Sequence, residues 1–247
     1  MEINEDTLKY LAGKYKFSLT YLEKDYYLTY LLYLIKDIKG LYFKGGTALY
    51  KIFLNHLRLS EDLDFTVKGN IREIEKQIRE KIKSEKIFKE IKHDKRTKHF
   101  TRLLIYYESF YGKDHIIIDL NKKAKIYLET EEYELKHFYK DYIPRFNVKT
   151  LHIKEIIAEK ITALVQRYAP RDYYDIYNII NKKLPIDMKL VEKKFKDSNE
   201  EFSVERIFRR GNKIYSKWKS DLLPLTNTKP DFHKVMKALA KFFKYRV

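Results

Sequence analysis

Two spacings of apolar residues divide the first 150 residues into helical and strand-like segments. Residues 21–38 carry Leu and Tyr three or four positions apart, and residues 71–82 repeat Ile at the same spacing against a face of Lys, Arg and Glu. This period is typical of amphipathic helices. We therefore predict helices over residues 6–13, 21–38, 47–55 and 71–82.

Between these segments lie short runs rich in aromatic and β-branched residues. Residues 41–44 and 62–67 read as single strands, and residues 103–107 and 115–120 flank a turn over 111–114. Such runs around a Gly-containing turn indicate a β-hairpin.

After Pro144 the strand signals vanish. Helical periodicity continues instead over residues 154–168, 171–181, 188–196, 201–209 and 231–245, with breaks at Pro170, Pro185 and Pro224. The pattern predicts an α+β fold in which a mixed sheet with flanking helices is followed by an all-helical bundle. We expect two domains, residues 1–148 and 149–247.

The charge balance indicates the kind of partner. The 52 Lys and Arg against 35 Asp and Glu give a formal charge of +17, which favours a polyanion, with nucleic acid first and an anionic membrane second. The alternative is that the lysines only solvate the surface. Basic faces that could meet phosphates occur at Lys76, Lys81, Lys83 and at Lys92, Lys95, Arg96, Lys98.

The absence of cysteine excludes disulfides and cysteine-bound metal, and it is typical of a reducing compartment. The acidic start does not read as a signal peptide, and no run of eighteen apolar residues occurs. We expect a cytoplasmic protein with no membrane partner.

The most informative stretch joins a glycine turn to an acidic pair. Only 7 glycines occur in the chain, and Gly45 and Gly46 stand side by side between a predicted strand and a predicted helix. Because side chains alternate along a strand, Asp62 and Asp64 share one face. Two such carboxylates suit Mg²⁺, and backbone N–H groups of a glycine turn can approach phosphates. The alternatives are an ordinary tight turn and aspartates that cap a turn or pair with Arg58.

A third carboxylate, Asp119, ends the apolar run Ile116–Ile118. A lone carboxylate in a buried strand needs a partner. If its strand lies beside that of Asp62 and Asp64, the three groups converge on one or two metal ions.

A second charged motif lies in the helical half. Lys160 and Arg167 share a helical face, and Arg171 and Asp175 stand four apart on the next predicted helix. These residues read equally as an inter-helix salt-bridge network or as phosphate ligands, since Arg suits bidentate phosphate binding and Lys supplies a point charge.

Taken together, four segments resemble the AbiEii/AbiGii toxin family, part of the nucleotidyltransferase superfamily that includes DNA polymerase β. They are residues 23–26, 43–49 (FKGGTAL), 58–65 (RLSEDLDF) and 160–175. The resemblance spans about residues 20 to 180 in order, and the last 65 or so residues carry no motif of the family. It implies that the first domain is nucleotidyltransferase-like.

The resemblance also implies residue roles. Lys44, Gly45, Gly46 and Thr47 would cradle a nucleoside triphosphate, with Arg58 and Ser60 lining the pocket. Asp62 and Asp64 would be catalytic metal ligands, with Asp119 as the third. Lys160 would steady the triphosphate, Asp175 would close the helical motif, and Arg167 and Arg171 would contact the nucleotide.

The function implied is a Mg²⁺-dependent nucleotidyltransferase that acts as the toxin of a toxin–antitoxin or abortive-infection pair. Its acceptor would be RNA, with tRNA among the candidates, and its protein partner a cognate antitoxin. Two alternatives stay open: a nucleic-acid- or partner-binding protein with a degraded site, and a phosphotransferase acting on protein or small molecules.

Overall fold

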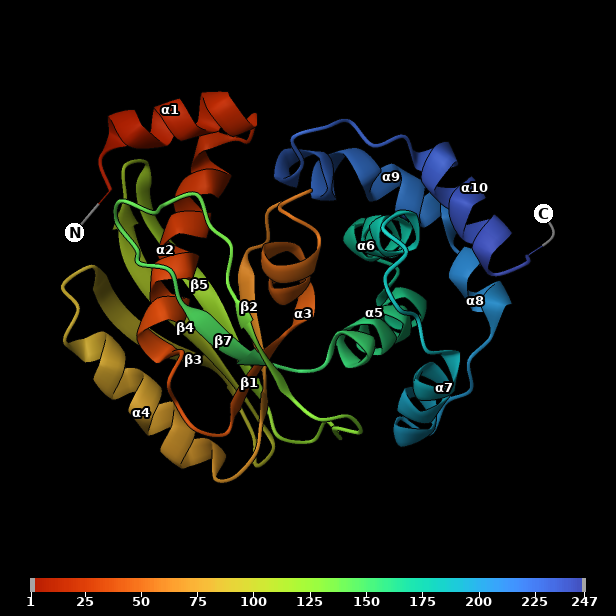
Figure 1. The fold of residues 1–247 in the computed structure, drawn as a ribbon, viewed down its shortest axis with the longest axis horizontal. Coiled ribbons are helices and arrows are strands. Elements are labelled where there is room, and N and C mark those ends of the chain that lie inside the picture. Colours follow the sequence, from red (N-terminus) through yellow and green to blue (C-terminus); the bar gives the residue numbers. More distant parts are fainter. Residues whose placement is uncertain (1–2, 246–247) are drawn as a thin grey trace. The chain divides into compact units, whose positions relative to one another are not determined.

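A computed structural model of the chain describes residues 3–245. The chain divides into two compact units, one that ends at Leu151 and one that begins at His152 (Figure 1). The first contains all the strands of the described chain, and the second is helical. The predicted α+β class is confirmed. The strand β7 (Asn147–Thr150) crosses the predicted join at residues 148/149.

The first unit is built on a mixed sheet of seven strands in the order β3-β4-β5-β2-β1-β7-β6. β1 pairs with β7 and β2 with β5 in parallel, and the other neighbours are antiparallel. The strands are β1 (Leu41–Lys44), β2 (Asp62–Val67), β3 (Phe88–Arg96), β4 (Phe100–Ser109), β5 (Gly112–Asn121), β6 (Glu131–Glu134) and β7.

Alternation along the central strands separates two faces of this sheet. Leu63 and Phe65 of β2 are buried, as are the alternate residues of β4 and β5. This face packs against α2 (Leu19–Ile35), which contacts α1 (Glu5–Tyr15) and α4 (Ile71–Lys83) (Figure 1). The other alternate residues are half-buried, and we call their side of the sheet the second face.

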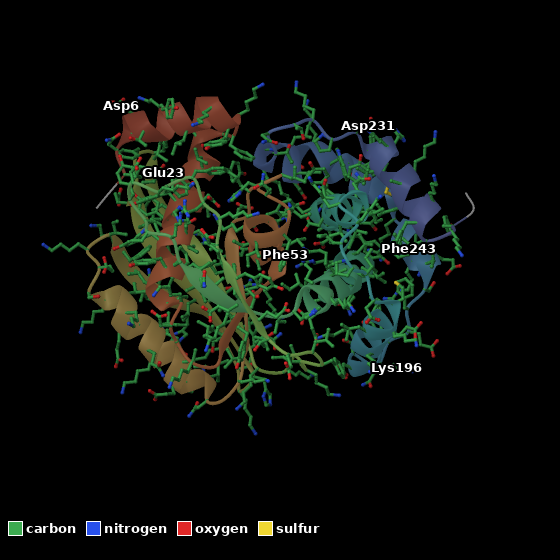
Figure 2. All side chains as sticks on the ribbon, in the orientation of Figure 1. Asp6, Glu23, Phe53, Lys196, Asp231 and Phe243 are labelled. Atoms are coloured by element: carbon green, nitrogen blue, oxygen red, sulfur yellow. The ribbon has the colours of Figure 1, made fainter. Side chains whose placement is uncertain are left out.

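The glycine turn leads into α3 (Gly45–Ala48) and then a π-helix (Leu49–Phe53). Inside the π-helix, Lys51 Nζ lies 2.7 Å from an Asp25 carboxylate oxygen of α2 and donates to Thr29 Oγ1 at 2.9 Å. The predicted helix over 47–55 is therefore wrong in form. It ends at Phe53, labelled in Figure 2, because Asn55 and His56 adopt left-handed conformations (φ 52° and 55°).

Three strands escaped prediction. β3 is rich in Lys, His and Asp and lacks the alternation of a half-buried strand, because it lies at the sheet edge. β6 and β7 are four residues long and pair with each other. The expectation that strands end before Pro144 is therefore wrong: β7 follows it and pairs with β1.

The second unit packs helices around α5 and α6. α5 contacts α6, α7 and α8, while α6 contacts α9 and α10. The helices are α5 (Ile153–Arg167), α6 (Pro170–Asn181), α7 (Met188–Asp197), α8 (Val204–Phe208), α9 (Gly211–Asp221) and α10 (Phe232–Phe242), with a 3-10 turn at Leu223–Leu225. The sequence missed α9, which buries only Ile214 and Trp218. Within residues 3–245, no helix has the length and apolarity needed to cross a bilayer.

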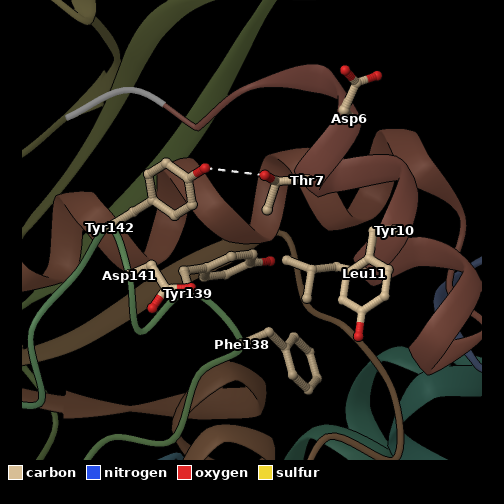
Figure 3. Close-up of a pocket in the computed structure, with 8 residues that line it drawn as sticks. All are labelled: Asp6, Thr7, Tyr10, Leu11, Phe138, Tyr139, Asp141 and Tyr142. Atoms are coloured by element: carbon tan, nitrogen blue, oxygen red, sulfur yellow. Dashed lines mark hydrogen bonds between the residues drawn. The ribbon is translucent and has the colours of Figure 1, made fainter.

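A pocket of about 390 Å³ lies between α1 and the segment 138–142 (Figure 3). Thr7 and Tyr142 share a hydrogen bond of 3.0 Å at its edge, and Tyr10 and Leu11 line it from α1. It shares no residue with the predicted site.

Candidate active site

The glycine turn and the acidic pair meet directly. Gly45 has φ 77°, and a Cβ atom placed on it would lie 2.1 Å from Asp64 Oδ2. Lys44, at the end of β1, stands opposite Asp64 in the antiparallel register. Thr47 Oγ1 donates to the backbone carbonyl of Asp62 at 2.5 Å. Only glycine fits at position 45, because the carboxylate occupies the space that any side chain would fill.

The second glycine faces the segment that leads into β2. A Cβ atom on Gly46 would lie 2.9 Å from Arg58 Nη2 and 3.4 Å from Ser60 Oγ. Arg58 is buried, lies over the Tyr50 ring at 4.5 Å and donates from Nη1 to the Leu59 carbonyl at 2.8 Å. The fold therefore gathers the predicted nucleotide-binding residues of the first unit around Asp62 and Asp64.

The acidic residues share the second face of the sheet. Asp62 and Asp64 are half-buried, while Leu63 between them is fully buried on the opposite face. β5 lies beside β2 with Asp119 opposite Asp64. The two strands that carry the three carboxylates are therefore neighbours, as their convergence requires.

Asp119 is, however, held by a residue that the sequence did not single out. Arg102 of β4 donates from Nε and Nη2 to the two Asp119 oxygens, both at 2.7 Å. The hydrogen bond to Asp119 is the main cause that raises the pKa of Arg102, and the nearby charges of Asp119, Asp94 and Asp62 add to it. The signal in the sequence was an Arg directly before the predicted strand 103–107. Its partner follows only from the β4–β5 register, which sets Arg102 opposite Asp119.

The donor set fits a hard divalent cation through two carboxylates. Mg²⁺ is commonly held by one or two carboxylates together with substrate phosphates, and Asp62 and Asp64 provide such a pair beside the glycine turn. In the described part of the chain, no group of three or more His, Cys, Asp or Glu is placed to hold a metal ion. A metal-binding role for Asp119 stays a prediction, and Arg102 competes for the same oxygens.

In the helical unit, buried Lys160, Asp172 and Asp175 form a charged network that exposed Arg167 joins. Lys160 Nζ lies 2.9 Å from Asp172 Oδ1 and 2.8 Å from Asp175 Oδ2. Arg167 donates from Nε to Asp172 Oδ2 at 2.8 Å. Burial alone would raise the pKa of the Asp172 carboxyl, but the charges of Lys160 and Arg167 outweigh it and lower that pKa.

Asp172 is the member of this network that the sequence analysis did not name. It accepts from both cations, whereas Arg171, beside it, is half-buried at the start of α6. The available signal was its position five residues after Arg167. The network joins α5 to α6, as expected of an inter-helix salt-bridge cluster, and it also places Lys160 and Asp175 in contact.

Solved structures share this fold. MenT4, a nucleotidyltransferase toxin from Mycobacterium tuberculosis, aligns with a TM-score of 0.72 over 100% of this chain and 91% of its own, at 20% identity. JHP933 from Helicobacter pylori aligns with a TM-score of 0.63 over 92% of each chain, also at 20% identity. At these identities the likeness shows the fold alone.

The family follows from the sequence itself. Residues 29–242 match the family model described as nucleotidyl transferase AbiEii toxin, type IV toxin–antitoxin system. The chain therefore belongs to the AbiEii family of nucleotidyltransferase toxins, which confirms the resemblance. None of the curated proteins matches it.

Proposed function

We propose that this protein transfers a nucleoside monophosphate from a nucleoside triphosphate to RNA, using Mg²⁺, and that a cognate antitoxin restrains it. The observation that carries the proposal is the close approach of Gly45 to Asp64, which brings the glycine turn proposed to bind phosphate against a carboxylate proposed to bind metal. Family membership supplies the reaction class. The charge of +17 favours RNA as acceptor.

In the reaction we propose, an acceptor hydroxyl attacks the α-phosphorus in line. The new bond joins the hydroxyl oxygen to phosphorus, the bond to the β-phosphate oxygen breaks, pyrophosphate leaves, and the hydroxyl proton passes to water. When bound, Mg²⁺ would supply Lewis-acid activation of the hydroxyl and neutralise charge on the leaving group.

Each predicted site residue has a distinct role in the proposed reaction. Asp62 and Asp64 would hold the metal, with Asp119 as a third ligand once released from Arg102. Backbone N–H groups of residues 45–47 would orient the triphosphate, because a glycine turn allows close approach. Arg58 and Ser60 would line the pocket beside Gly46. In the helical unit, Lys160 and Asp175 are proposed as catalytic, and Arg167 and Arg171 as nucleotide ligands, from the family motif.

The test is label transfer to total cellular RNA, with each of the four triphosphates labelled at the α-phosphate. Incorporation that requires Mg²⁺ and disappears in Asp62→Asn/Asp64→Asn supports the proposal. Transfer from the γ-phosphate instead would identify a phosphotransferase. Binding of RNA with no label transfer from any triphosphate, and with no Mg²⁺-dependent thermal stabilisation by triphosphates, would identify a binding protein.

A further inference from the structure

Two aromatic rings on the second face of the sheet each lie beneath two cations. Lys95 Nζ lies 5.8 Å from the centroid of the Phe100 ring, and the Arg102 guanidinium lies 5.9 Å from it. Lys92 and Lys113 lie 5.3 and 4.7 Å from the Tyr106 ring. Both rings are half-buried. Each therefore combines a partly accessible aromatic surface with charges that attract phosphates.

Strand register connects these rings to the acidic pair. One row across the sheet runs from Asp64 through Asp119 and Arg102 to Lys95. The next row runs from Asp62 through Ile117 and Leu104 to Lys92. Phe100 and Tyr106 flank these rows on β4, six residues or about 20 Å apart at the rise of a strand. The rings thus belong to the same face as the proposed catalytic carboxylates.

The charge of this face is not uniform. Glu90 lies 3.1 Å from Lys92 and 3.5 Å from Lys113, and Asp94 lies 3.8 Å from Arg102. Around the rings, the four cations are therefore nearly balanced by these two carboxylates and Asp119. The excess positive charge comes from the rim at the Phe100 end, where three exposed lysines stand: Lys98, Lys122 and Lys123.

The three rim lysines lie just outside the strands and are tied to the sheet by a backbone hydrogen bond. The backbone N–H of Lys122 donates to the His99 carbonyl at 2.9 Å, which ties the end of β5 to the β3–β4 turn. Lys98 and the lysines after β5 are thereby held next to Phe100.

This combination is the chemistry of single-stranded nucleic acid recognition. Bases of any sequence stack on aromatic rings, while cations follow the phosphates. We propose that the strip from Phe100 to Tyr106 binds the unpaired end of the RNA acceptor and leads its terminal hydroxyl to Asp62 and Asp64. The proposal rests on the nucleotidyltransferase function above and adds where the acceptor binds.

The first test measures binding without catalysis. A fluorescent single-stranded oligoribonucleotide is titrated in the absence of triphosphate and Mg²⁺, and anisotropy is recorded. Phe100→Leu and Tyr106→Leu remove a ring and keep apolar bulk, so each should weaken affinity at least about fivefold, since a stacked base contributes about 1–3 kcal/mol. Tyr106→Phe keeps the ring and should bind within about twofold of the natural chain.

A matched control uses another tyrosine ring that lies under a lysine, on a different part of the first unit. Tyr10 on α1 is 63% exposed and lies under Lys14 at 5.4 Å, yet it lines the pocket of Figure 3 instead of the second face. Tyr10→Leu should leave RNA affinity unchanged. Equal losses from Tyr10→Leu and Tyr106→Leu would overturn the assignment of the strip.

A second test replaces lysines and leaves both aromatic rings in place. Lys98→Ala/Lys122→Ala alters two exposed lysines of the rim and should reduce the dependence of RNA affinity on salt, because fewer counterions are released on binding. An unchanged salt dependence would overturn the proposal even if the Leu variants do not fold. Binding of an acidic peptide that is lost in these variants, while RNA affinity is kept, would assign the strip to a protein partner and equally overturn it.

The two proposals fail separately. RNA binding that depends on Phe100 and Tyr106 supports the strip even if no triphosphate yields label transfer, which would overturn only the enzymatic function. Conversely, Tyr106→Leu could leave label transfer, RNA affinity and the KM for the acceptor all unchanged. That result would overturn only the proposal that the strip binds the acceptor.

Discussion

The sheet and the helical unit both gather charged side chains, but they arrange them in opposite ways. Asp62 and Asp64 place like charges on a half-buried face, beside a glycine turn that closely approaches the Asp64 carboxylate. Lys160 and Asp172 instead place opposite charges in contact, each no more than 5% exposed. Like charges held together are stabilised by a bound cation, whereas paired opposite charges already satisfy one another. The difference distinguishes the proposed metal-binding site from a charge network that stabilises the fold.

The largest expected effect is on the helical network. Lys160→Met leaves Asp172 and Asp175 buried without their shared cation, so the free energy of unfolding should fall by about 3–5 kcal/mol. Chemical denaturation measures this loss, and Lys160→Arg should recover part of it. If the Met variant is destabilised but keeps its activity per folded molecule, Lys160 has no part in catalysis. Unchanged stability would contradict the comparison itself.

The acidic pair should respond in the opposite sense. Asp62→Asn or Asp64→Asn should reduce label transfer by about 10²–10³-fold, the usual cost of losing one group that stabilises transition-state charge. Stability should fall by less than in Lys160→Met, because both aspartates are half-buried whereas Asp172 and Asp175 are buried. Rate and thermal melting are measured on the same preparations. Glu132→Gln, on exposed strand β6, is the control and should affect neither.

Gly45→Ala tests the contact between the turn and the carboxylate. The new methyl group would displace Asp64, and a shift of about 1 Å in a catalytic group can cost about a hundredfold in rate. Gly69→Ala is a matched control, because its φ of 108° is equally unfavourable for alanine while no atom lies within 4 Å of the added Cβ. The left-handed backbone should cost both variants about 1–2 kcal/mol of stability, and the overlap with Asp64 should add to that loss in Gly45→Ala. An equal loss of activity in both would remove the special role of Gly45.

The smallest effect concerns a buried group that lacks an opposite charge in contact. Burial lowers the pKa of His56 to about 3, with the charge of Lys51 adding to the shift. The unfolded chain binds a proton below about pH 6.5 while the folded protein does not, so stability falls as pH drops from 6.5 towards 3. The loss should be about 2 kcal/mol at pH 5 relative to pH 8.

His56→Asn removes this titration and keeps a residue that tolerates the left-handed backbone. The pH dependence of thermal unfolding between pH 5 and 8 should then flatten. A variant that retains the full slope would show that another group, such as His137, is responsible.

Local sequence patterns were sufficient for part of the site. β1 and β2 have their predicted bounds, because their apolar residues are dense and β2 alternates cleanly with its aspartates. That alternation alone placed Asp62 and Asp64 on one face. Most predicted helices agree within about three residues at each end, since their periodicity is long enough to average out local exceptions.

Other features depended on contacts between distant segments. The buried pairing of Lys51 with Asp25 joins the π-helix to α2, across 26 residues of sequence, and it has no local signal. β3 is a strand because β4 supplies its partner, not because of its own composition.

The sequence by itself determined the class of fold, the family, and the residue types of the site, because these follow from periodicity and from short motifs read along one strand or turn. Only the tertiary structure decided that Gly45 lies against Asp64, that Arg102 holds Asp119, and that Asp172 joins Lys160 to Arg167. Each of these contacts requires strand register or helix packing, which bring together residues 5 to 19 positions apart and are set by the burial of apolar faces elsewhere in the chain.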